Sequence, residues 1–188
     1  MTRIISGFAG SRELKVPKSG TRPTSDRVRE AIFSALESRD AIAGAQVLDL
    51  YAGSGALALE ALSRGAQAAT MVEKNPAAAT LLKSNAELIR TAGGLPSSAI
   101  LVATQSVTAF LSRPSATRFD LVFIDPPYEL TNEELTLILT EIIPVLAEDA
   151  EVIVERSTRT GQFSIPAGLV QTKTKPYGET TIHWLSLE

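Results

Sequence analysis

The apolar run from Leu121 to Ile124 ends abruptly in the sequence Asp125-Pro126-Pro127-Tyr128, and this transition constrains the fold more than any other stretch of the chain. The run is β-branched and aromatic and too short for a buried helix, so it predicts a strand that is buried on both faces. Each proline fixes its own φ, lacks an N–H and drives the residue before it into an extended conformation. We therefore expect a stiff corner at the carboxyl end of a central strand, which is the edge of an open α/β sheet where ligands bind.

This corner suits a reaction in which an sp² amino nitrogen attacks an electrophile. The lone pair of such a nitrogen is delocalised, and acceptors on its two N–H bonds would orient the group and localise the lone pair. Asp125 supplies one acceptor and the carbonyl of Pro126 can supply the other. Tyr128 offers a ring on which a planar base can stack, a contact worth about 1–3 kcal/mol in nucleic-acid sites. A rigid turn without chemistry is the alternative interpretation.

Strand-like and helix-like segments alternate along the rest of the chain. The patterns predict core strands at 46–51, 69–73, 100–103, 121–124 and 151–155, and helices at 25–38, 56–64, 76–91, 105–112 and 131–146. They also predict an N-terminal hairpin from 3–8 and 12–16 and a closing antiparallel pair from 168–174 and 180–187. The alternation indicates parallel βαβ units in a sheet covered by helices on both faces. We expect one structural unit, with residues 1–42 as an extension and residues 43–188 as the main domain.

Composition narrows the classes of protein that the chain can belong to. Its 188 residues include no cysteine and one histidine, which excludes disulfides and a cysteine nucleophile and argues against a zinc site. We expect no metal. The sequence shows neither a signal peptide nor an apolar run of membrane-spanning length, and we expect a cytoplasmic monomer that does not associate with membranes.

Charge is distributed unevenly along the chain. The net charge is −3, yet residues 1–30 carry seven basic and three acidic side chains, so this stretch is at +4 and the remainder is at −7. A basic arm on an acidic body indicates a polyanionic partner such as RNA, although a solvated surface hairpin is the alternative. The candidate RNA-binding residues are Arg3, Arg12, Lys15, Lys18, Arg22, Thr24 and Arg27. Arg29 is expected beside Arg27 on the polar face of the first helix.

A second motif, Asp49-x-x-x-Gly53-x-Gly55, joins the first core strand to the following helix. The third glycine of a dinucleotide fingerprint is replaced by Ala58, and no Gly-Lys-Ser/Thr follows, which excludes a phosphate loop. Glu73 ends the next strand, where a carboxylate can hold the two hydroxyls of a ribose. A carboxylate before the turn, two glycines in it and a second carboxylate that can bind the ribose together favour S-adenosylmethionine over NAD as the ligand.

Several stretches together resemble the RsmD-like family of bacterial methyltransferases, which act on the 2-amino group of a guanine in 16S ribosomal RNA. The stretches that carry the resemblance are 3–7 (RIISG), 22–30 (RPTSDRVRE), 47–57 (VLDLYAGSGAL), 60–66 (EALSRGA), 72–73 (VE), 125–128 (DPPY), 154–155 (VE) and 177–178 (YG). The resemblance covers nearly the whole chain, and the second and fourth of these stretches are much more family-specific than the glycine loop.

The resemblance implies a class I, Rossmann-like methyltransferase fold with a mostly parallel seven-stranded sheet, and 16S rRNA in a small-subunit particle as partner. It implies Asp125, Pro126 and Tyr128 as catalytic residues. The implied S-adenosylmethionine-binding residues are Asp49, Tyr51, Ala52, Gly53, Gly55, Glu73, Lys74, Gln105, Ser106 and Asp125. One position departs from the family: many relatives carry Asp or Asn against the adenine amine, where this chain has Ser106, with Gln105 or a backbone carbonyl as alternatives.

Three other functions are compatible with the Asp-Pro-Pro-Tyr corner in part. A DNA adenine or cytosine amino-methyltransferase would use the same corner, but 188 residues leave little room for a domain that reads DNA sequence. Protein-glutamine methyltransferases typically carry Asn in place of Asp125. A non-catalytic nucleic-acid binder would need neither Glu73 nor Asp125. Methylation of an amino group in RNA is therefore the preferred hypothesis.

Overall fold

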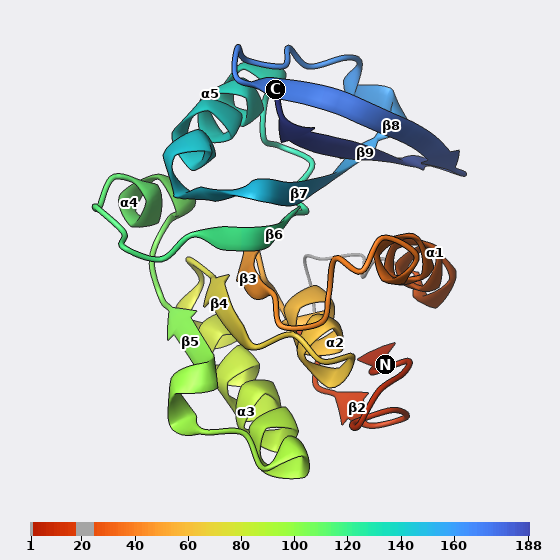
Figure 1. Cartoon of the computed structure of the whole chain (residues 1–188), viewed down its shortest axis with the longest axis vertical. Helices are drawn as coiled ribbons and strands as arrows, with labels where there is room; N and C mark the ends of the chain where they lie inside the picture. The colour runs from red at the N-terminus through yellow and green to blue at the C-terminus, as the bar shows by residue number, and fades with distance from the viewer. Residues whose placement is uncertain (1, 18–24) are drawn as a thin grey trace.

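Seven strands form one sheet in the computed structural model, which describes residues 2–17 and 25–188 (Figure 1). The strand order is β5-β4-β3-β6-β7-β9-β8. The first five strands of the sheet are parallel, and β9 is antiparallel to both of its neighbours. The bounds are β3 (Gln46–Asp49), β4 (Ala68–Val72), β5 (Ile100–Ala103), β6 (Phe119–Ile124), β7 (Leu146–Ser157), β8 (Leu169–Tyr177) and β9 (Thr180–Leu187). The predicted mostly parallel seven-stranded sheet is confirmed.

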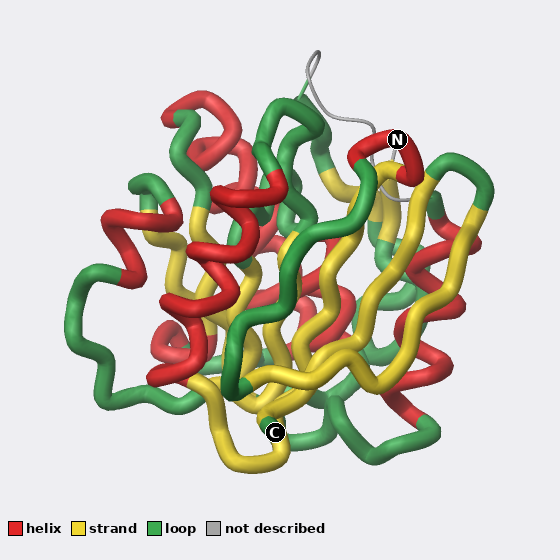
Figure 2. Tube along the Cα trace, turned by 90° about the horizontal axis from the view of Figure 1, so that it is seen from above, coloured by secondary structure: helices red, strands yellow, loops and turns green. Residues whose placement is uncertain are grey.

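Helices cover both faces of the sheet, as the view from above shows (Figure 2). One face packs under α1 (Asp26–Glu37), α2 (Ala56–Ser63) and α3 (Pro76–Gly93), and the other under α4 (Val107–Leu111) and α5 (Asn132–Ile142). The described residues also form three short 3₁₀ turns, at Ser97–Ala99, Ile143–Val145 and Thr158–Thr160. None of the helices in the described ranges is both long enough and apolar enough to cross a bilayer.

The sequence specifies where the helices begin. Ser25 accepts a hydrogen bond from the Val28 N–H, and Asn75 accepts two from the first turn of α3, whose first residue is a proline. Thr131 and Glu134 form a capping box at the start of α5. These side chains satisfy N–H groups that lack an intrahelical partner, and each of these three helices starts within one residue of its predicted position.

Strand β7 is the largest difference from the predicted elements. It begins at Leu146, five residues before the expected start, and α5 ends at Ile142, four residues before its expected end. Pro144 explains both differences, because it removes an N–H donor and forces the chain out of the helix into a short 3₁₀ turn. The N-terminal hairpin is also much shorter than predicted, with β1 (Thr2–Arg3) paired to β2 (Glu13–Leu14).

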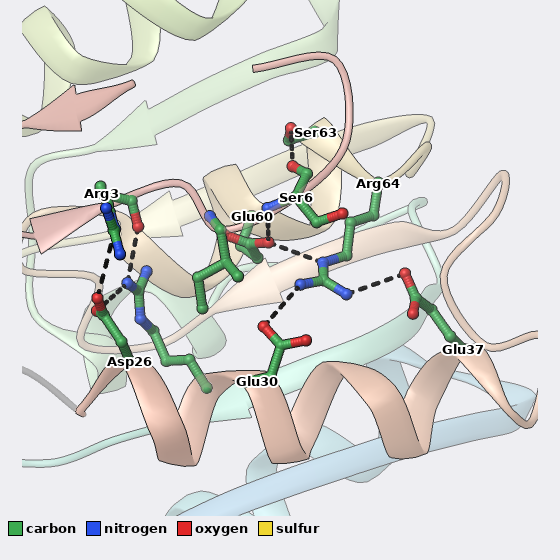
Figure 3. A network of polar contacts seen from close by, with 10 residues as sticks. Arg3, Ser6, Asp26, Glu30, Glu37, Glu60, Ser63 and Arg64 are labelled. Atoms are coloured by element: carbon green, nitrogen blue, oxygen red, sulfur yellow. Dashed lines mark hydrogen bonds and ion pairs between the residues drawn. The ribbon is translucent and has the colours of Figure 1, made fainter. Parts of the chain in front are cut away.

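A buried polar network attaches the N-terminal segment to α2 and α1 (Figure 3). The Glu60 side chain is fully buried, and its carboxylate accepts hydrogen bonds from the Ile5 and Ser6 N–H groups and from Arg64 Nε at 2.7, 3.0 and 2.7 Å. The guanidinium of Arg64 also forms ion pairs with two carboxylates on α1, with Nη2 3.7 Å from Glu30 Oε2 and Nη1 3.0 Å from Glu37 Oε1. The residue pattern Glu-x-x-Ser-Arg on α2 therefore has a structural role: it fixes the N-terminal segment against the core.

Arg29 does not lie on the polar face of α1, where the sequence analysis placed it. Its side chain is fully buried, and Nη2 donates to Asp26 Oδ1 and to the carbonyl of Arg3, each at 2.7 Å. The prediction was wrong because helical spacing treats every arginine as polar, whereas a guanidinium can be buried if its donors find oxygen acceptors. Arg29 connects α1 to β1 and is not part of a solvent-facing basic surface.

Candidate active site

A cavity of about 240 Å³ opens at the carboxyl ends of β3, β4, β6 and β7. The strand order reverses there, since β3 lies between β4 on one side and β6 on the other, and such switch points are where open α/β sheets bind ligands. The cavity is lined by Tyr51, Gly53, Val72, Glu73, Lys74, Gln105, Val107, Asp125, Pro126, Pro127, Tyr128, Glu129, Glu155, Arg156, Ser157 and Thr180. It therefore brings the glycine loop and the proline corner into one site.

Glu73 lies at the end of β4 and organises the half of the cavity nearest β3 and β4. Its Oε2 accepts a hydrogen bond from the Gly53 N–H at 3.0 Å, and its Oε1 accepts one from the Asn75 N–H at 2.7 Å. Each carboxylate oxygen has a second lone pair. Glu73 can thus hold the glycine loop in place and still accept hydrogen bonds from a pair of hydroxyls on a ligand.

Tyr51 adopts a backbone conformation that is rare for residues other than glycine, with φ of +121°. Such strain costs on the order of 1–3 kcal/mol and persists only where the surroundings enforce it. Its ring lines the cavity and packs against the core under α4 and α5. Burial and the nearby Glu134 carboxylate raise the pKa of Tyr51 to about 12. The phenol therefore stays protonated and can act as a hydrogen-bond donor.

Gly55 allows the close packing of α2 against its neighbours. Its φ is +80°, and a Cβ atom at this position would lie 2.5 Å from Leu82 Cδ1 and 3.2 Å from the sulfur of Met71. Only glycine combines that φ with such a close approach. Gly55 is buried and does not line the cavity, whereas Gly53 does.

Asp49 lies beneath the glycine loop and is fully buried. Its Oδ2 accepts a weak hydrogen bond from the Ala58 N–H at 3.4 Å, and its Oδ1 has no partner in the described part of the chain. Burial raises the pKa of Asp49 to about 7, with a further contribution from the charge of Glu73. The Asp49 carboxylate thus forms a negative charge poorly compensated by the protein, which a cation bound in the neighbouring loop would stabilise.

The proline corner forms the opposite wall of the cavity. Asp125 is partly buried at the end of β6, and Pro126 is buried directly after it. Tyr128 is 61% exposed, which is unusual for a large aromatic side chain, and it lies at the rim. A carboxylate inside the cavity and an exposed ring at its mouth are the two features that a flat amino-bearing base requires.

Some of the remaining predicted ligand-binding residues line the cavity, and the others lie in the turn and at the helix start next to it. Lys74 and Gln105 line the cavity. Ala52 is buried in the turn, where its N–H donates to the Val72 carbonyl at 3.0 Å. Ser106 caps α4 by accepting a hydrogen bond from the Ala109 N–H, and it does not line the cavity. Of the two side chains that are candidates for the adenine contact, Gln105 lines the cavity and Ser106 does not, and a backbone carbonyl remains the third candidate.

The predicted RNA-binding residues lie on the N-terminal segment and on α1. Arg3, Arg12, Lys15 and Arg27 are exposed. Arg3 lies 3.7 Å from Asp26, and Lys15 Nζ donates to Ser84 Oγ at 3.2 Å. Lys18, Arg22 and Thr24 lie outside the described residues.

The part of the cavity that β7 and β9 supply was not predicted from the sequence. Glu155, Arg156 and Ser157 end β7, and Thr180 begins β9. The apolar run before Glu155 resembles the run before Asp125, so its end could have been recognised as a second functional strand end. The involvement of Thr180 depends on the antiparallel pairing of β9 with β7, which no local pattern reveals.

No group of three or more His, Cys, Asp or Glu side chains in residues 2–17 and 25–188 is arranged to hold a metal ion. Among the described residues, the lining of the cavity carries acidic side chains at Glu73, Asp125, Glu129 and Glu155 and cations at Lys74 and Arg156. Lys74 follows β4 and Arg156 is in β7, and these strands lie on opposite sides of β3 and β6 in the sheet. This arrangement suits an extended organic ligand with several hydrogen-bonding groups.

The strand order, the glycine loop after β3 and the acid at the end of β4 define a class I methyltransferase fold. The family model described as conserved hypothetical protein 95 matches residues 2–186, and the chain belongs to that family. This is the RsmD family that the sequence motifs resemble, so the predicted family membership is confirmed.

Individual proteins agree with this assignment. The chain is 38% identical over 178 residues to "Ribosomal RNA small subunit methyltransferase D" of Escherichia coli K12, covering 94% of this chain and 85% of the relative. The solved structure of yhhF from Escherichia coli, a provisional methyltransferase, superposes with a TM-score of 0.83 at 32% identity, covering 100% and 98% of the two chains. SMU.776, another provisional methyltransferase and solved with SAH bound, shares the fold at a TM-score of 0.66 and 16% identity, over 89% of this chain and 50% of its own.

Proposed function

We propose that this protein transfers a methyl group from S-adenosylmethionine to the exocyclic 2-amino group of a guanine in 16S ribosomal RNA. The observation that carries the proposal is that Glu73 and the Asp125-Pro126-Pro127-Tyr128 corner line one cavity. The name of the Escherichia coli relative supports ribosomal RNA of the small subunit as the substrate. SAH in a neighbour of the same fold supports S-adenosylmethionine as the donor.

The donor occupies the half of the cavity between β3, β4 and β5 in this proposal. Glu73 accepts hydrogen bonds from the ribose hydroxyls, Gln105 contacts the adenine, and Gly53 lets the ligand approach the loop backbone. Asp49 lies beneath that loop, where its charge favours the cationic sulfonium and amino groups of the donor.

The target guanine enters the other half of the cavity after leaving its stack, which costs a few kcal/mol. Asp125 and the Pro126 carbonyl accept hydrogen bonds from the 2-amino group, and Tyr128 stacks on the base. The nitrogen lone pair then points at the methyl group. The main catalytic contribution is this in-line positioning, which in well-oriented systems can reach roughly 7–11 kcal/mol.

Asp125→Ala should lower the single-turnover rate of methylation by about two to four orders of magnitude, the scale for a positioned acid–base group. The measurement uses excess enzyme, saturating S-adenosylmethionine and small-subunit rRNA from a strain that lacks the gene. Glu129→Ala is the matched control, because it removes another carboxylate of the cavity lining. A near-normal rate in Asp125→Ala would contradict the assigned role.

Mass spectrometry of rRNA nucleosides from a deletion strain tests the substrate directly. The strain should lack one N2-methylguanosine of 16S rRNA, and a plasmid copy of the gene should restore it. Loss of a methylated adenine or cytosine instead, or an unchanged nucleoside profile, would overturn the proposed substrate. Comparing naked rRNA with small subunits as substrates in vitro then establishes whether the protein acts on the assembled particle.

A further inference from the structure

Arg156 is a buried cation at the end of β7 that the mechanism above does not use. Its side chain is 4% exposed and lines the cavity. Nη2 donates to the Leu130 carbonyl and to Asn132 Oδ1, each at 2.9 Å. Within the described part of the chain these two bonds go to neutral oxygens, and Arg156 forms no ion pair with a carboxylate there. A buried guanidinium without a carboxylate partner is costly for stability, so it calls for a role in binding a ligand.

The position of Arg156 relative to Asp125 follows from the sheet register. Ile124 of β6 pairs with Val154 of β7, so the ends of the two strands run on side by side. This places the backbone of Arg156 beside the turn that begins at Asp125. The other cation that the described residues contribute to the cavity lining, Lys74, follows Glu73 at the end of β4, on the donor side. Arg156 is therefore the cation of the acceptor half of the described site.

Guanine presents complementary chemistry at the two ends of one edge. Its 2-amino group donates hydrogen bonds, and its O6 and N7 atoms accept them, with O6 on the same edge as the 2-amino group. Arginine with O6 or N7 of guanine is the commonest specific contact between proteins and bases. A base whose 2-amino group is at Asp125 would direct O6 along the cavity wall toward the β7 side.

We propose that Arg156 is a specificity-determining residue that donates a hydrogen bond to O6 of the target guanine. This inference rests on the proposed guanine-N2 activity. Adenine carries an amino group in place of O6, so it would leave the buried guanidinium without an acceptor. A phosphate is a poorer candidate partner, because the Arg156 side chain is 4% exposed and the RNA backbone would have to follow the base into the cavity to reach it.

A matched pair of substrates tests the contact. The nucleotide that loses its methyl group in the deletion strain is placed in an RNA fragment, either as guanine or as 2-aminopurine. 2-Aminopurine keeps the 2-amino group and lacks O6. Single-turnover methylation is measured for both fragments with saturating S-adenosylmethionine, in the form of the RNA, naked or assembled with small-subunit proteins, that the wild type methylates.

The protein variants are Arg156→Gln and the control Arg159→Gln. Both remove one positive charge from neighbouring positions, but Arg159 is exposed and does not line the cavity. The wild type and Arg159→Gln should prefer guanine to 2-aminopurine by roughly 10-fold or more, the usual discrimination of an arginine–guanine contact. Arg156→Gln should be slower on guanine and nearly unchanged on 2-aminopurine, so that the preference disappears.

The outcomes separate this inference from the proposed function. If the deletion strain loses no N2-methylguanosine of 16S rRNA, the proposed function fails and the inference fails with it. If that nucleotide is found but the wild type methylates guanine and 2-aminopurine equally well, the inference alone is overturned. If Arg156→Gln slows both fragments equally, Arg156 only holds the loop through Leu130 and Asn132, and the inference alone is overturned. If Arg156→Gln keeps the preference but flattens the salt dependence of RNA binding, Arg156 contacts a phosphate, and the inference is again overturned.

Discussion

At the scale of single residues, Glu73 is the side chain on which donor binding depends most directly. Glu73→Ala should weaken S-adenosylmethionine binding by about 1–3 kcal/mol, the loss expected for hydrogen bonds to a charged group. The same change removes the acceptor for the Gly53 N–H and loosens the glycine loop. Titration calorimetry with S-adenosylmethionine measures the change, and Glu155→Ala, on the β7 side of the cavity, is the control. If Glu73→Ala and the wild type bind S-adenosylmethionine with equal affinity, Glu73 does not bind the ribose hydroxyls.

Asp49 should make the stability of the protein depend on pH. Its folded-state pKa is raised from 3.8 to about 7, so between these values the folded state binds more protons than the unfolded state. The contribution of Asp49 is therefore most favourable below pH 4, decreases as the pH rises to about 7 and is constant above it. Because one pKa unit corresponds to about 1.4 kcal/mol, the contribution of Asp49 to the free energy of unfolding should change by about 4 kcal/mol between pH 4 and pH 7.

Urea unfolding of the wild type and of Asp49→Asn at pH 5, 6, 7 and 8 measures this effect. The asparagine does not titrate, so the free energy of unfolding of the wild type relative to the variant should fall from pH 5 to pH 7 and then level off. A difference that stays constant over the whole range would show that Asp49 is ionised in the folded protein at pH 5.

At the scale of elements, the contact between the N-terminal segment and α2 depends on the absence of a side chain at Gly7. A Cβ atom there would lie 1.8 Å from the Ser63 carbonyl oxygen, while φ is +81°. Gly44 has a similar φ of +75° and open space around it. Gly44→Ala should therefore cost about 1–2 kcal/mol of stability, the penalty of the left-handed conformation alone, and Gly7→Ala should cost more. Similar urea midpoints for the two variants would mean that the segment moves aside without loss.

Asn85 on α3 connects the N-terminal segment to the donor loop. Its Oδ1 accepts from the Lys15 N–H at 2.9 Å, and its Nδ2 donates to the carbonyls of Lys15 and Ser54 at 2.8 and 2.9 Å. Asn85→Ala should weaken S-adenosylmethionine binding, because the Ser54 carbonyl between the two glycines loses its donor. Ser84→Ala is the control, since the Ser84 hydroxyl accepts a hydrogen bond from the exposed Nζ of Lys15 and none is found from it to the donor loop within the described residues. If calorimetry gives the wild-type affinity for both variants, the donor loop is held without Asn85.

At the scale of the whole molecule, we expect the basic N-terminal segment to bind the RNA backbone and the cavity to position one base. We expect exposed cations of the segment to contact phosphates, which fix the register of the RNA and carry no sequence preference. Neutralising Arg12, Lys15 and Lys18 together should flatten the salt dependence of RNA binding by about 0.7–0.9 in logarithmic slope per lost phosphate contact. Donor affinity should stay unchanged.

The matched control neutralises exposed lysines at the other end of the molecule. Lys173 and Lys175 lie on the edge strand β8, and their ammonium groups sit over the rings of Trp184 and Tyr177. Filter binding at several salt concentrations should give a wild-type slope for Lys173→Gln/Lys175→Gln. A wild-type slope for the N-terminal triple variant would instead show that these three cations do not contact the RNA.

The sequence by itself determined the sheet, its helical layers and the two motifs of the cavity. The β-branched run before Asp125, the helix caps and the strand-end acid Glu73 are local patterns, and their physical causes act over a few residues. The parallel alternation of strands and helices then leaves few topologies, since right-handed crossovers are strongly favoured.

Only the tertiary structure decided which residues from distant segments meet. Arg156 enters the cavity because β7 pairs parallel with β6, and Thr180 because β9 pairs antiparallel with β7. Arg29 is buried because the Arg3 carbonyl comes within reach of α1. Gly55 must be glycine because Leu82 on another helix packs against it. These facts depend on the pairing and packing of elements many residues apart, and a polar side chain carries no local signal that tells whether distant acceptors will permit its burial.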